Sequence, residues 1–581
     1  MITVFGGRKI ERARALRAAA ALLLAVSAGT AFAGTTGKIA GFVVDYRDRP
    51  VKDAAVTVME TAQFALTDGA GRFNLINVPS GLYRIEVSKI GYRPLIMKDV
   101  VVSADQTVWL NLEIPAETDV METVEVTADR PVVEVNLTSS MATLTAGEIE
   151  ELPVQELQDV VNLQAGVVDG HFRGGRVGEV QWQVDGVTVN NPYDNKSSLR
   201  LDRSLLREVQ VISGTFDAEY GQAMSGVVNA VLRRGTPDFQ WSAEVFTGDH
   251  LLSGGESRRL TDDPFQPFSL KNLQFTLSGP TGLPNTMFLL NGQRYEDLGF
   301  IRAERRFLPT DDSDFENKIY YPNGDGEEVP LGFSKEWSGA FKVSNNSLRT
   351  IRLSYQAILN GIERKKEDWA YRYNPEGLAT QRTFSLVHGL DVTHDLSGSL
   401  FYNLSLRHNY FDYSDYAYED VYDERYDRAG PPVSDDNYEP GAIIQGVDFT
   451  RFEQETEIFL MKTSLVGQVT PEQMIKLGGE IQWPVVRFGT PGHLTYTTVD
   501  GEPALVRHVD EPPDYPGVSE YEPVLAAAYA QDQVEWNHLT LRAGVRFDYF
   551  DARSTVPGDP ANPANSISGA PDSGPRRFMP A

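Results

Sequence analysis

The chain has 581 residues, with 53 Lys and Arg against 81 Asp and Glu, and it has no Cys. A formal charge of −28 excludes a protein whose main task is to neutralise nucleic-acid phosphates, and the missing Cys excludes disulfides and thiolate chemistry. A mean hydropathy of −0.30 excludes a bundle of membrane helices but not a membrane barrel, because barrel strands face lipid only at every second residue.

The first 33 residues have the pattern of a secretory signal peptide. Five basic residues between positions 8 and 17 precede an uncharged run over 18–33, which ends in Ala31-Phe32-Ala33. A basic start, a short apolar core and small residues before the cleavage point are typical of export signals, and this core is too short for a stable membrane anchor. We therefore expect cleavage after Ala33. The alternative interpretation is an amphipathic helix of a cytoplasmic protein.

Residues 34–115 are predicted to form an all-β sandwich. Short runs of alternating apolar residues, such as 39–44, 72–76 and 82–87, are separated by turns rich in Gly, Pro and Asp. Strands with this spacing are typical of small sandwiches. The strings "RPVKDAAVTV" and "TDGAGRFNLINVPSGLYRIEVSKIGY" resemble the carboxypeptidase regulatory-like domain, a transthyretin-like fold. The resemblance implies a non-catalytic accessory module.

The linker over 116–135 is acidic and rich in Thr and Val. Its centre is an alternating run made of Glu122, Thr123, Val124, Glu125, Val126, Thr127 and Ala128. A β-branched run without a compact apolar partner can add as a strand to another sheet. Taken alone, the pattern favours an ordinary linker, and the segment that follows gives it a second interpretation.

The segment over 136–237 carries short motifs in series. It begins with a helix signal at Thr145, where acidic residues follow and Pro153 ends the run. The later motifs are Arg173-Gly174-Gly175, Asp185-Gly186 with Asn190-Asn191-Pro192, Val209-Gln210-Val211-Ile212, Glu219-Tyr220-Gly221 and Gly226-Val227-Val228-Asn229. In this order they resemble the plug domain of TonB-dependent outer-membrane receptors. The resemblance implies a small α+β domain inside a barrel, and it makes Glu122–Ala128 the candidate TonB box.

Some of these residues also have an independent physical reason. Asp185-Gly186 between two alternating apolar runs is a strong signal for a type I′ hairpin. Four glycines allow positive φ or close backbone approach, as a domain packed inside a cylinder requires. They are Gly174, Gly175, Gly221 and Gly226.

The arginines of this segment have two interpretations. As ordinary surface charges, they would be solvated. The resemblance implies instead that some of them face acidic or polar residues of the barrel wall and hold the plug by charged hydrogen bonds. The candidates are Arg173, Arg176, Arg233 and Arg234.

From position 238 onward, the chain is predicted to be the first half of an antiparallel transmembrane β-barrel. Eleven segments alternate between apolar and polar residues, which predicts strands with one apolar face. They are 239–248, 271–278, 286–296, 334–343, 351–360, 381–393, 400–411, 455–466, 474–487, 524–534 and 539–550. The connections are alternately long and short. A membrane barrel gathers its tight turns at the periplasmic end and its long loops outside, whereas a soluble sandwich has no reason to sort its loops.

A predicted outer loop over 412–428 is dense in carboxylates and tyrosines. These groups could hold a sugar, a cationic peptide or Ca²⁺, although acidic runs more often remain solvated. The candidate ligand residues are Asp412, Tyr413, Asp415, Tyr416, Tyr418, Asp420 and Tyr422. The eight His residues show neither a zinc spacing nor a hydrolase motif, so we expect no metal, no cofactor and no enzymatic activity.

The resemblance implies a receptor in the outer membrane of a Gram-negative bacterium, surrounded by lipid and lipopolysaccharide. Ligand binding at the outer loops and plug apex would expose the box to TonB, energised by ExbB and ExbD, and the extracellular ligand would then pass inward. The regulatory-like domain favours an oligosaccharide or peptide over a siderophore or cobalamin. Two alternatives remain, a passive porin or adhesin barrel and a soluble carbohydrate-binding sandwich protein.

The number of predicted strands bears on length. Barrels of the family that these motifs resemble have 22 strands, and a single-chain barrel closes with an even number. Eleven strands over 238–581 would therefore be half of a barrel in a protein of about 900 residues or more.

Overall fold

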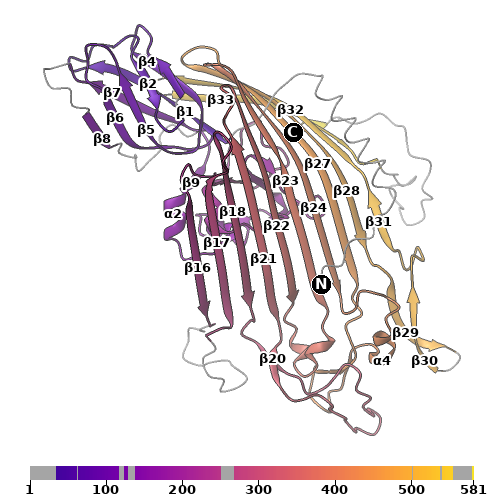
Figure 1. Ribbon diagram of the computed structural model, residues 1–581. Coiled ribbons are helices and arrows are strands. Elements are labelled where there is room, and N and C mark those ends of the chain that lie inside the picture. The colour runs from indigo at the N-terminus through magenta and orange to yellow at the C-terminus, as the bar shows by residue number, and fades with distance from the viewer. Residues whose placement is uncertain are drawn as a thin grey trace.

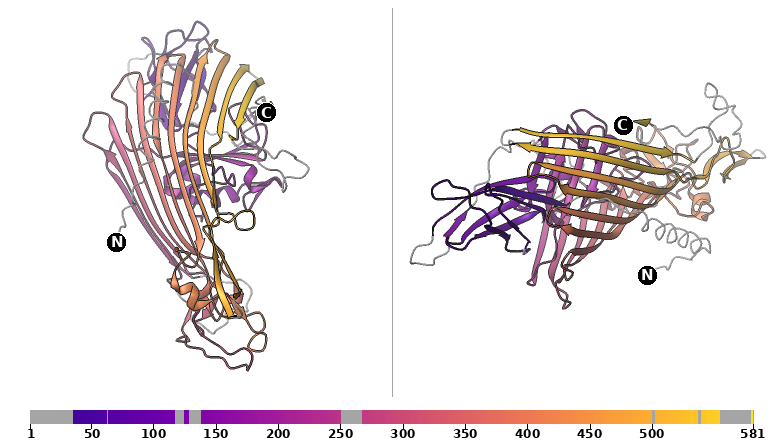
Figure 2. Two further views of the ribbon diagram at one scale, coloured as in Figure 1. Left: turned by 90° about the vertical axis from the view of Figure 1, so that its right-hand side faces the viewer. Right: turned by 90° about the horizontal axis from the view of Figure 1, so that it is seen from above.

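The computed structural model describes residues 35–61, 63–116, 124–127, 138–249, 267–499, 502–536, 539–553 and 579–580. Three units follow one another along the chain: the sandwich (35–116), the plug-like domain (138–237) and a curved antiparallel sheet, here called the wall (238–553). The wall curves around one side of the plug-like domain, and the sandwich lies at one end of both (Figure 1; Figure 2). Among the described residues, no helix is long and apolar enough to cross a membrane.

The sandwich consists of two sheets that enclose one apolar core. Its strands are β1 (Thr36–Asp45), β2 (Ala55–Val58), β3 (Gln63–Leu66), β4 (Arg72–Pro79), β5 (Gly81–Ser88), β6 (Leu95–Val102) and β7 (Thr107–Ile114). One sheet has the order β4-β1-β7 and the other the order β3-β2-β5-β6-β8. Alternate side chains such as Ile39, Val56 and Ile85 are buried between the sheets. The predicted all-β sandwich is confirmed.

The second sheet of the sandwich ends in β8 (Val124–Thr127), which comes from the linker. It pairs in parallel with β6, so that Val124 lies opposite Leu95 and Thr127 opposite Lys98. The other predicted box residues and the predicted signal peptide lie outside the described residues; they are Glu122, Thr123, Ala128 and residues 1–33.

The plug-like domain is a mixed five-stranded sheet of order β13-β12-β15-β14-β9 with two short helices. Its main elements are β9 (Met141–Thr145), α2 (Ala146–Glu151), α3 (Leu157–Asn162), β12 (Val180–Val184), β13 (Val187–Thr188), β14 (Leu206–Ile212) and β15 (Gly226–Leu232). The small strands β10 (Val167–Val168) and β11 (His171–Phe172) form a separate hairpin, and the single turns η1 (Val177–Glu179) and η2 (Arg203–Leu205) precede β12 and β14.

Two local predictions in this domain are confirmed. Asp185 and Gly186 have φ angles of 50° and 77° between paired β12 and β13, which is the type I′ geometry. At the start of α2, the backbone N–H of Thr145 donates to the Glu148 carboxylate at 2.7 Å, and this bond caps the helix.

The wall contains all eleven predicted strands, each antiparallel to its neighbours in the chain. They are β16 (Gln240–Gly248), β17 (Leu270–Pro280), β18 (Thr286–Asp297), β21 (Phe333–Asn345), β22 (Ile351–Lys365), β23 (Thr380–Ser397), β24 (Leu400–Tyr416), β27 (Phe452–Gln468), β28 (Gln473–Gly489), β32 (Val524–Trp536) and β33 (Leu539–Asp551). Two short strands join them, β31 (Val518–Tyr521) beside β28 and β34 (Met579–Pro580) beside β33. In the described part of the chain, β16 and β34 are the two ends of this sheet and do not pair with each other.

The outward face of the wall is apolar across its width. Large hydrophobic side chains stand exposed there on many of its strands, because none of the described residues packs against that face. They include Trp241, Leu273, Leu290, Phe341, Tyr355, Leu390, Phe459 and Leu477. An exposed apolar surface that extends over many neighbouring strands is typical of a face that contacts lipid or a partner.

The described long connections, over 298–332, 366–379, 417–451 and 490–523 without 500 and 501, fold into ordered caps at the end of the wall opposite the sandwich (Figure 1). Their elements are β19 (Arg302–Glu304), β20 (Glu328–Pro330), η3 (Trp369–Tyr371), η4 (Pro375–Gly377), α4 (Glu424–Ala429), β25 (Val433–Ser434), β26 (Ile443–Gln445), β29 (His493–Val499) and β30 (Glu502–His508). Small apolar cores hold these loops together, with Tyr426, Tyr371 and Phe307 buried in three of them.

Several strands of the wall extend further than predicted, among them β22, which ends at Lys365 rather than at position 360. The prediction of a loop over 412–428 is wrong for the run from Asp412 to Tyr416, which continues β24, in which Asp412 pairs with Phe384 of β23 and with Glu455 of β27. The acidic residues misled the prediction because charge predicts solvation, whereas backbone pairing to two neighbouring strands extends a strand regardless of its charge.

Candidate functional site

A cavity of about 440 Å³ lies between the tip of the plug-like domain and the inner face of the wall. The plug-like domain contributes Gln158 of α3 and the segment from Asn191 to Arg200, and strands β22, β23, β24 and β27 contribute the rest. Its neutral polar lining is Gln158, Asn191, Ser197, Ser198, Asn360, Thr383, Ser385 and Gln454. A hollow with convergent polar groups and aromatic rings is typical of a ligand site.

Four aromatic rings form one side of this cavity: Tyr193, Phe411, Tyr413 and Phe452. The ring centroid of Tyr193 lies 5.9 Å from that of Phe452 and 4.8 Å from that of Phe488, and Tyr413 lies 6.1 Å from Phe452. Tilted rings at these distances support one another and present apolar faces.

The predicted motif Asn190-Asn191-Pro192 explains how Tyr193 is positioned. The side chain of Asn190 accepts from the Trp182 N–H at 2.7 Å and donates to the carbonyls of Val180 and Asn195, each at 2.8 Å. The Tyr193 N–H donates to the Asn191 side chain at 3.1 Å. Sequence reasoning chose the motif but missed Tyr193, although an aromatic residue in a polar loop was an available signal.

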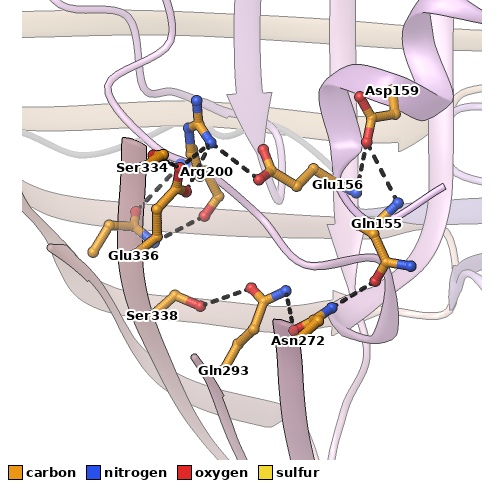
Figure 3. A network of polar contacts seen from close by, with 10 residues as sticks. Gln155, Glu156, Asp159, Arg200, Asn272, Gln293, Ser334, Glu336 and Ser338 are labelled. Carbon is orange, nitrogen blue, oxygen red and sulfur yellow. Dashed lines mark hydrogen bonds and ion pairs between the residues drawn. The ribbon is translucent and has the colours of Figure 1, made fainter. Parts of the chain in front are cut away.

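The charged groups that line the cavity are paired with one another or with the wall. Lys196 lies 3.3 Å from Asp194. Figure 3 shows Arg200 between Glu156 at the start of α3 and Glu336 of β21, at 3.2 Å and 2.7 Å. Burial, opposed by Arg200, raises the pKa of Glu156 to about 7. The cavity therefore offers a ligand rings, amides and hydroxyls rather than an uncompensated charge.

A polar network fastens this part of the plug-like domain to the wall. The backbone of Arg200 exchanges two hydrogen bonds with Asn360 of β22, at 3.2 Å and 3.0 Å. Beside it, Gln155 accepts from Asn272 at 2.6 Å, and Asn272 is linked through Gln293 to Ser338 (Figure 3). Neutral hydrogen bonds of this kind contribute about 1 kcal/mol each, so together they fix the domain without locking it irreversibly.

Buried ion pairs join the same two units, with a polarity opposite to the predicted one. Lys342 of β21 donates to Asp185 at 2.6 Å, and Lys476 of β28 donates to Glu219 at 2.5 Å. In these two pairs the wall supplies the cation and the plug-like domain the carboxylate. The prediction was that some of the named arginines face the wall. Arg233 does not, because it bonds to Glu150 of its own domain, whereas Arg234 lies beside polar wall residues such as Ser344 and Asn403.

Two arginines that the prediction did not name bond to carboxylates of the wall. Arg200 reaches Glu336 as described, and Arg203 reaches Glu244 of β16 at 3.1 Å. Sequence spacing alone could not choose among the arginines, because each wall partner lies dozens to hundreds of residues away.

The glycines of the predicted motifs sit where space is short. A Cβ on Gly221 would meet the Arg546 guanidinium of β33, and a Cβ on Gly226 would meet the Phe172 ring. Gly175 is equally close to Ser225, whereas Gly174 has a φ of 82° in an open position. The motif Glu219-Tyr220-Gly221 is therefore the point where the plug-like domain touches β28 and β33.

Among the candidate ligand residues of the acidic run, Tyr413 donates to Asp415 at 3.2 Å, but the set as a whole does not gather at one site. Tyr413 lines the cavity, while Asp415 beside it accepts from Gln381 at 2.7 Å. Asp412 and Tyr416 alternate to the other face of β24. The others lie in the outer cap, where Tyr418 packs on Tyr426, Asp420 accepts from the Tyr422 N–H, and Tyr422 is exposed. Within the residues that the structure describes, no group of three or more His, Asp or Glu is arranged to hold a metal ion.

The sandwich also forms ion pairs with the wall, at the end of the plug-like domain that lies away from the cavity. The turn between β6 and β7 carries Asp105, which lies 3.0 Å from Lys476. Lys38 of β1 bonds to Glu535 of β32 at 2.8 Å, and both side chains are buried. In addition, Ala104 bonds to Glu208 and Gln210 of β14, so the predicted accessory module is packed against both other units.

Comparisons with known proteins agree with this architecture. Residues 38–115 match the model of the carboxypeptidase regulatory-like domain, and residues 134–228 match that of the TonB-dependent receptor plug domain. Over 277 residues, the chain is 24% identical to the TonB-dependent transporter Oar of Myxococcus xanthus, covering 43% of this chain and 26% of that protein. The outer membrane transporter YddB from Escherichia coli has a TM-score of 0.52 and 14% identity, over 71% of this chain and 56% of that one.

The chain thus spans about a quarter of the Myxococcus relative and a little over half of the solved transporter. The likeness to the latter concerns the fold. The chain contains a carboxypeptidase regulatory-like domain, followed by the plug domain of TonB-dependent receptors and by a wall of the outer-membrane transporter fold, and the resemblance predicted from its motifs is confirmed.

Proposed function

We propose that this chain takes part in TonB-coupled uptake of an extracellular ligand across the outer membrane of a Gram-negative bacterium. The arrangement of the three units is the observation that supports this function. The cavity lies at the capped end of the wall, and β8, with the sandwich, lies at the other end. The outward apolar face of the wall contacts membrane lipid and lipopolysaccharide. The sandwich and β8 lie in the periplasm, where they meet TonB, which is energised by ExbB and ExbD.

The lining of the cavity favours a neutral oligosaccharide or a neutral peptide over an anionic iron chelate. Its lysine and arginine are already paired with carboxylates, so a multiply charged anion would have to break these pairs. The aromatic rings of the cavity, beside its amides and hydroxyls, instead suit a ligand that has apolar faces to stack on the rings and polar edges to form hydrogen bonds.

Deletion of 122–128 tests the coupling role. We expect the deleted protein to bind the ligand as the parent does and to lose uptake, because the strand that TonB would pull is missing. Uptake is measured in cells as accumulation of a fluorescently labelled neutral oligosaccharide mixture, and binding is measured on the purified protein. A deletion of equal length in the outer cap, over 316–322, is the control. Unchanged uptake by the first variant would favour a passive pore.

Replacement of Tyr413 by Ala tests the cavity. Removing a ring that a ligand stacks on should cost about 2 kcal/mol, or roughly 30-fold in Kd, for a sugar or peptide bound there. The matched control is Tyr496→Ala, which removes an exposed ring of β29 outside the cavity. Titrations with neutral oligosaccharides, neutral peptides and a ferric siderophore separate the substrate classes. An equal effect of both variants would place the ligand elsewhere.

A further inference from the structure

The strand β8 is held by the sandwich on one side only. It is the terminal strand of the sheet β3-β2-β5-β6-β8, and within the described residues no strand pairs with its outer edge. Across the pair with β6, the Lys98 side chain donates to the Glu125 carboxylate. A strand has two hydrogen-bonding edges, and an unpaired edge is a template for a further strand.

The side chains of β8 show which face a further strand would extend. In-register residues of neighbouring strands share a face, so Val126 lies on the same face as Met97, which packs against the sandwich core. Val126 remains 44% exposed there. An apolar residue on the next strand would cover it and continue the core by one strand.

Resting on the proposed function, we propose that the sandwich is part of the docking surface for TonB. The partner is an extended basic segment that adds to the free edge of β8 while β8 stays paired with β6, so that the sheet gains a sixth strand. The linker over 116–135 carries six acidic residues and one basic residue, which favours a basic partner segment. The competing arrangement is one in which β8 must leave β6 before the partner can bind.

A reversible cross-link separates the two arrangements. The chain has no Cys, so the pair Met97→Cys and Val126→Cys introduces its only two thiols, at positions directly opposite each other. Opposite residues on paired strands lie within the Cα range of a disulfide. The control pair is Glu86→Cys and Ile96→Cys, which cross-links β5 to β6 and leaves β8 free.

The measurement is the affinity of the purified chain for the periplasmic domain of TonB, before and after oxidation. We expect the oxidised 97–126 variant to bind within about threefold of its reduced form, as the control pair does. A loss of about tenfold or more on oxidation, restored by a reductant, would overturn the proposal, because β8 would then have to leave β6.

The deletion of 122–128 keeps this inference apart from the proposed function. If the deleted protein binds the TonB domain as well as the parent does, the coupling role itself is wrong and the docking surface falls with it. If the deletion abolishes binding and oxidation of the 97–126 variant also abolishes it, the coupling role stands and only the six-stranded arrangement is refuted.

Discussion

We expect Lys476→Met to loosen the junction of sandwich, plug and wall by about 3–5 kcal/mol. The Nζ atom of Lys476 lies 2.5 Å from Glu219 and 3.0 Å from Asp105, and the side chains of Lys476 and Glu219 are almost fully buried. Methionine keeps the length of the stem but leaves two carboxylates without their shared cation. An unpaired buried charge is more costly than the pair was favourable, so the loss should be large.

Hydrogen exchange of plug strands β14 and β15 measures this effect, because the connection between them carries Glu219 and a looser junction should lower their protection. The control is Lys271→Met, which removes another lysine of the wall from a carboxylate, Glu296, at 3.1 Å on a more exposed surface. That pair should contribute about 1 kcal/mol or less. The double variant Lys476→Met with Glu219→Gln should recover much of the loss. Equal exchange rates in the two lysine variants would show that Lys476 stabilises the junction no more than an exposed lysine of the wall does.

Local sequence patterns were sufficient for most of the architecture. Alternation located every long strand of the wall, because a strand with one apolar face has a period of two that no other element shares. The hairpin at Asp185-Gly186 and the cap at Thr145 were predictable for a similar reason, since each depends on residues within a few positions of one another.

Contacts between distant segments were not predictable in this way. Alternation states which face a side chain takes but not what it meets, so Lys342 and Lys476 gave no sign that Asp185 and Glu219 would be their partners. The cavity is formed by distant segments in the same way, since Tyr193 and Tyr413 both line it although more than two hundred residues separate them in the chain. The acidic run was a pattern that misled, because acidic composition predicts a solvated loop whereas the run is paired at the end of a strand.

The second large effect concerns pH and the contact between the sandwich and the plug. Glu208 of β14 is 3% exposed, and its carboxylate accepts from the Ala104 N–H at 3.2 Å and from Gln210 at 2.8 Å. Burial raises the pKa of Glu208 from 4.5 to about 7, against the lowering effect of these hydrogen bonds and of Arg207, while Asp105 raises it further. Between these two pKa values, the Glu208 carboxyl therefore holds a proton in the packed state and releases it when the contact opens.

The sign of the effect follows from this difference. A carboxyl whose pKa is raised in the packed state contributes most below its ordinary value of 4.5, and the contribution is lost as the pH rises through about 7. The whole shift corresponds to about 3 kcal/mol. Glutamine resembles the protonated acid, so Glu208→Gln should hold the sandwich more tightly than the parent by about 3 kcal/mol near pH 8 and by about 1 kcal/mol or less near pH 5.

Hydrogen exchange of the Ala104 amide, compared between variant and parent at each pH, measures this difference directly because that amide donates to Glu208. Comparison at equal pH cancels the intrinsic change of exchange rate. Glu151→Gln removes an exposed carboxylate of α2 and should leave the parent's pH dependence unchanged. If Glu208→Gln opens more readily than the parent near pH 8, the carboxylate is stabilised as an anion by Arg207 and its hydrogen bonds, and burial is not the dominant influence at this contact.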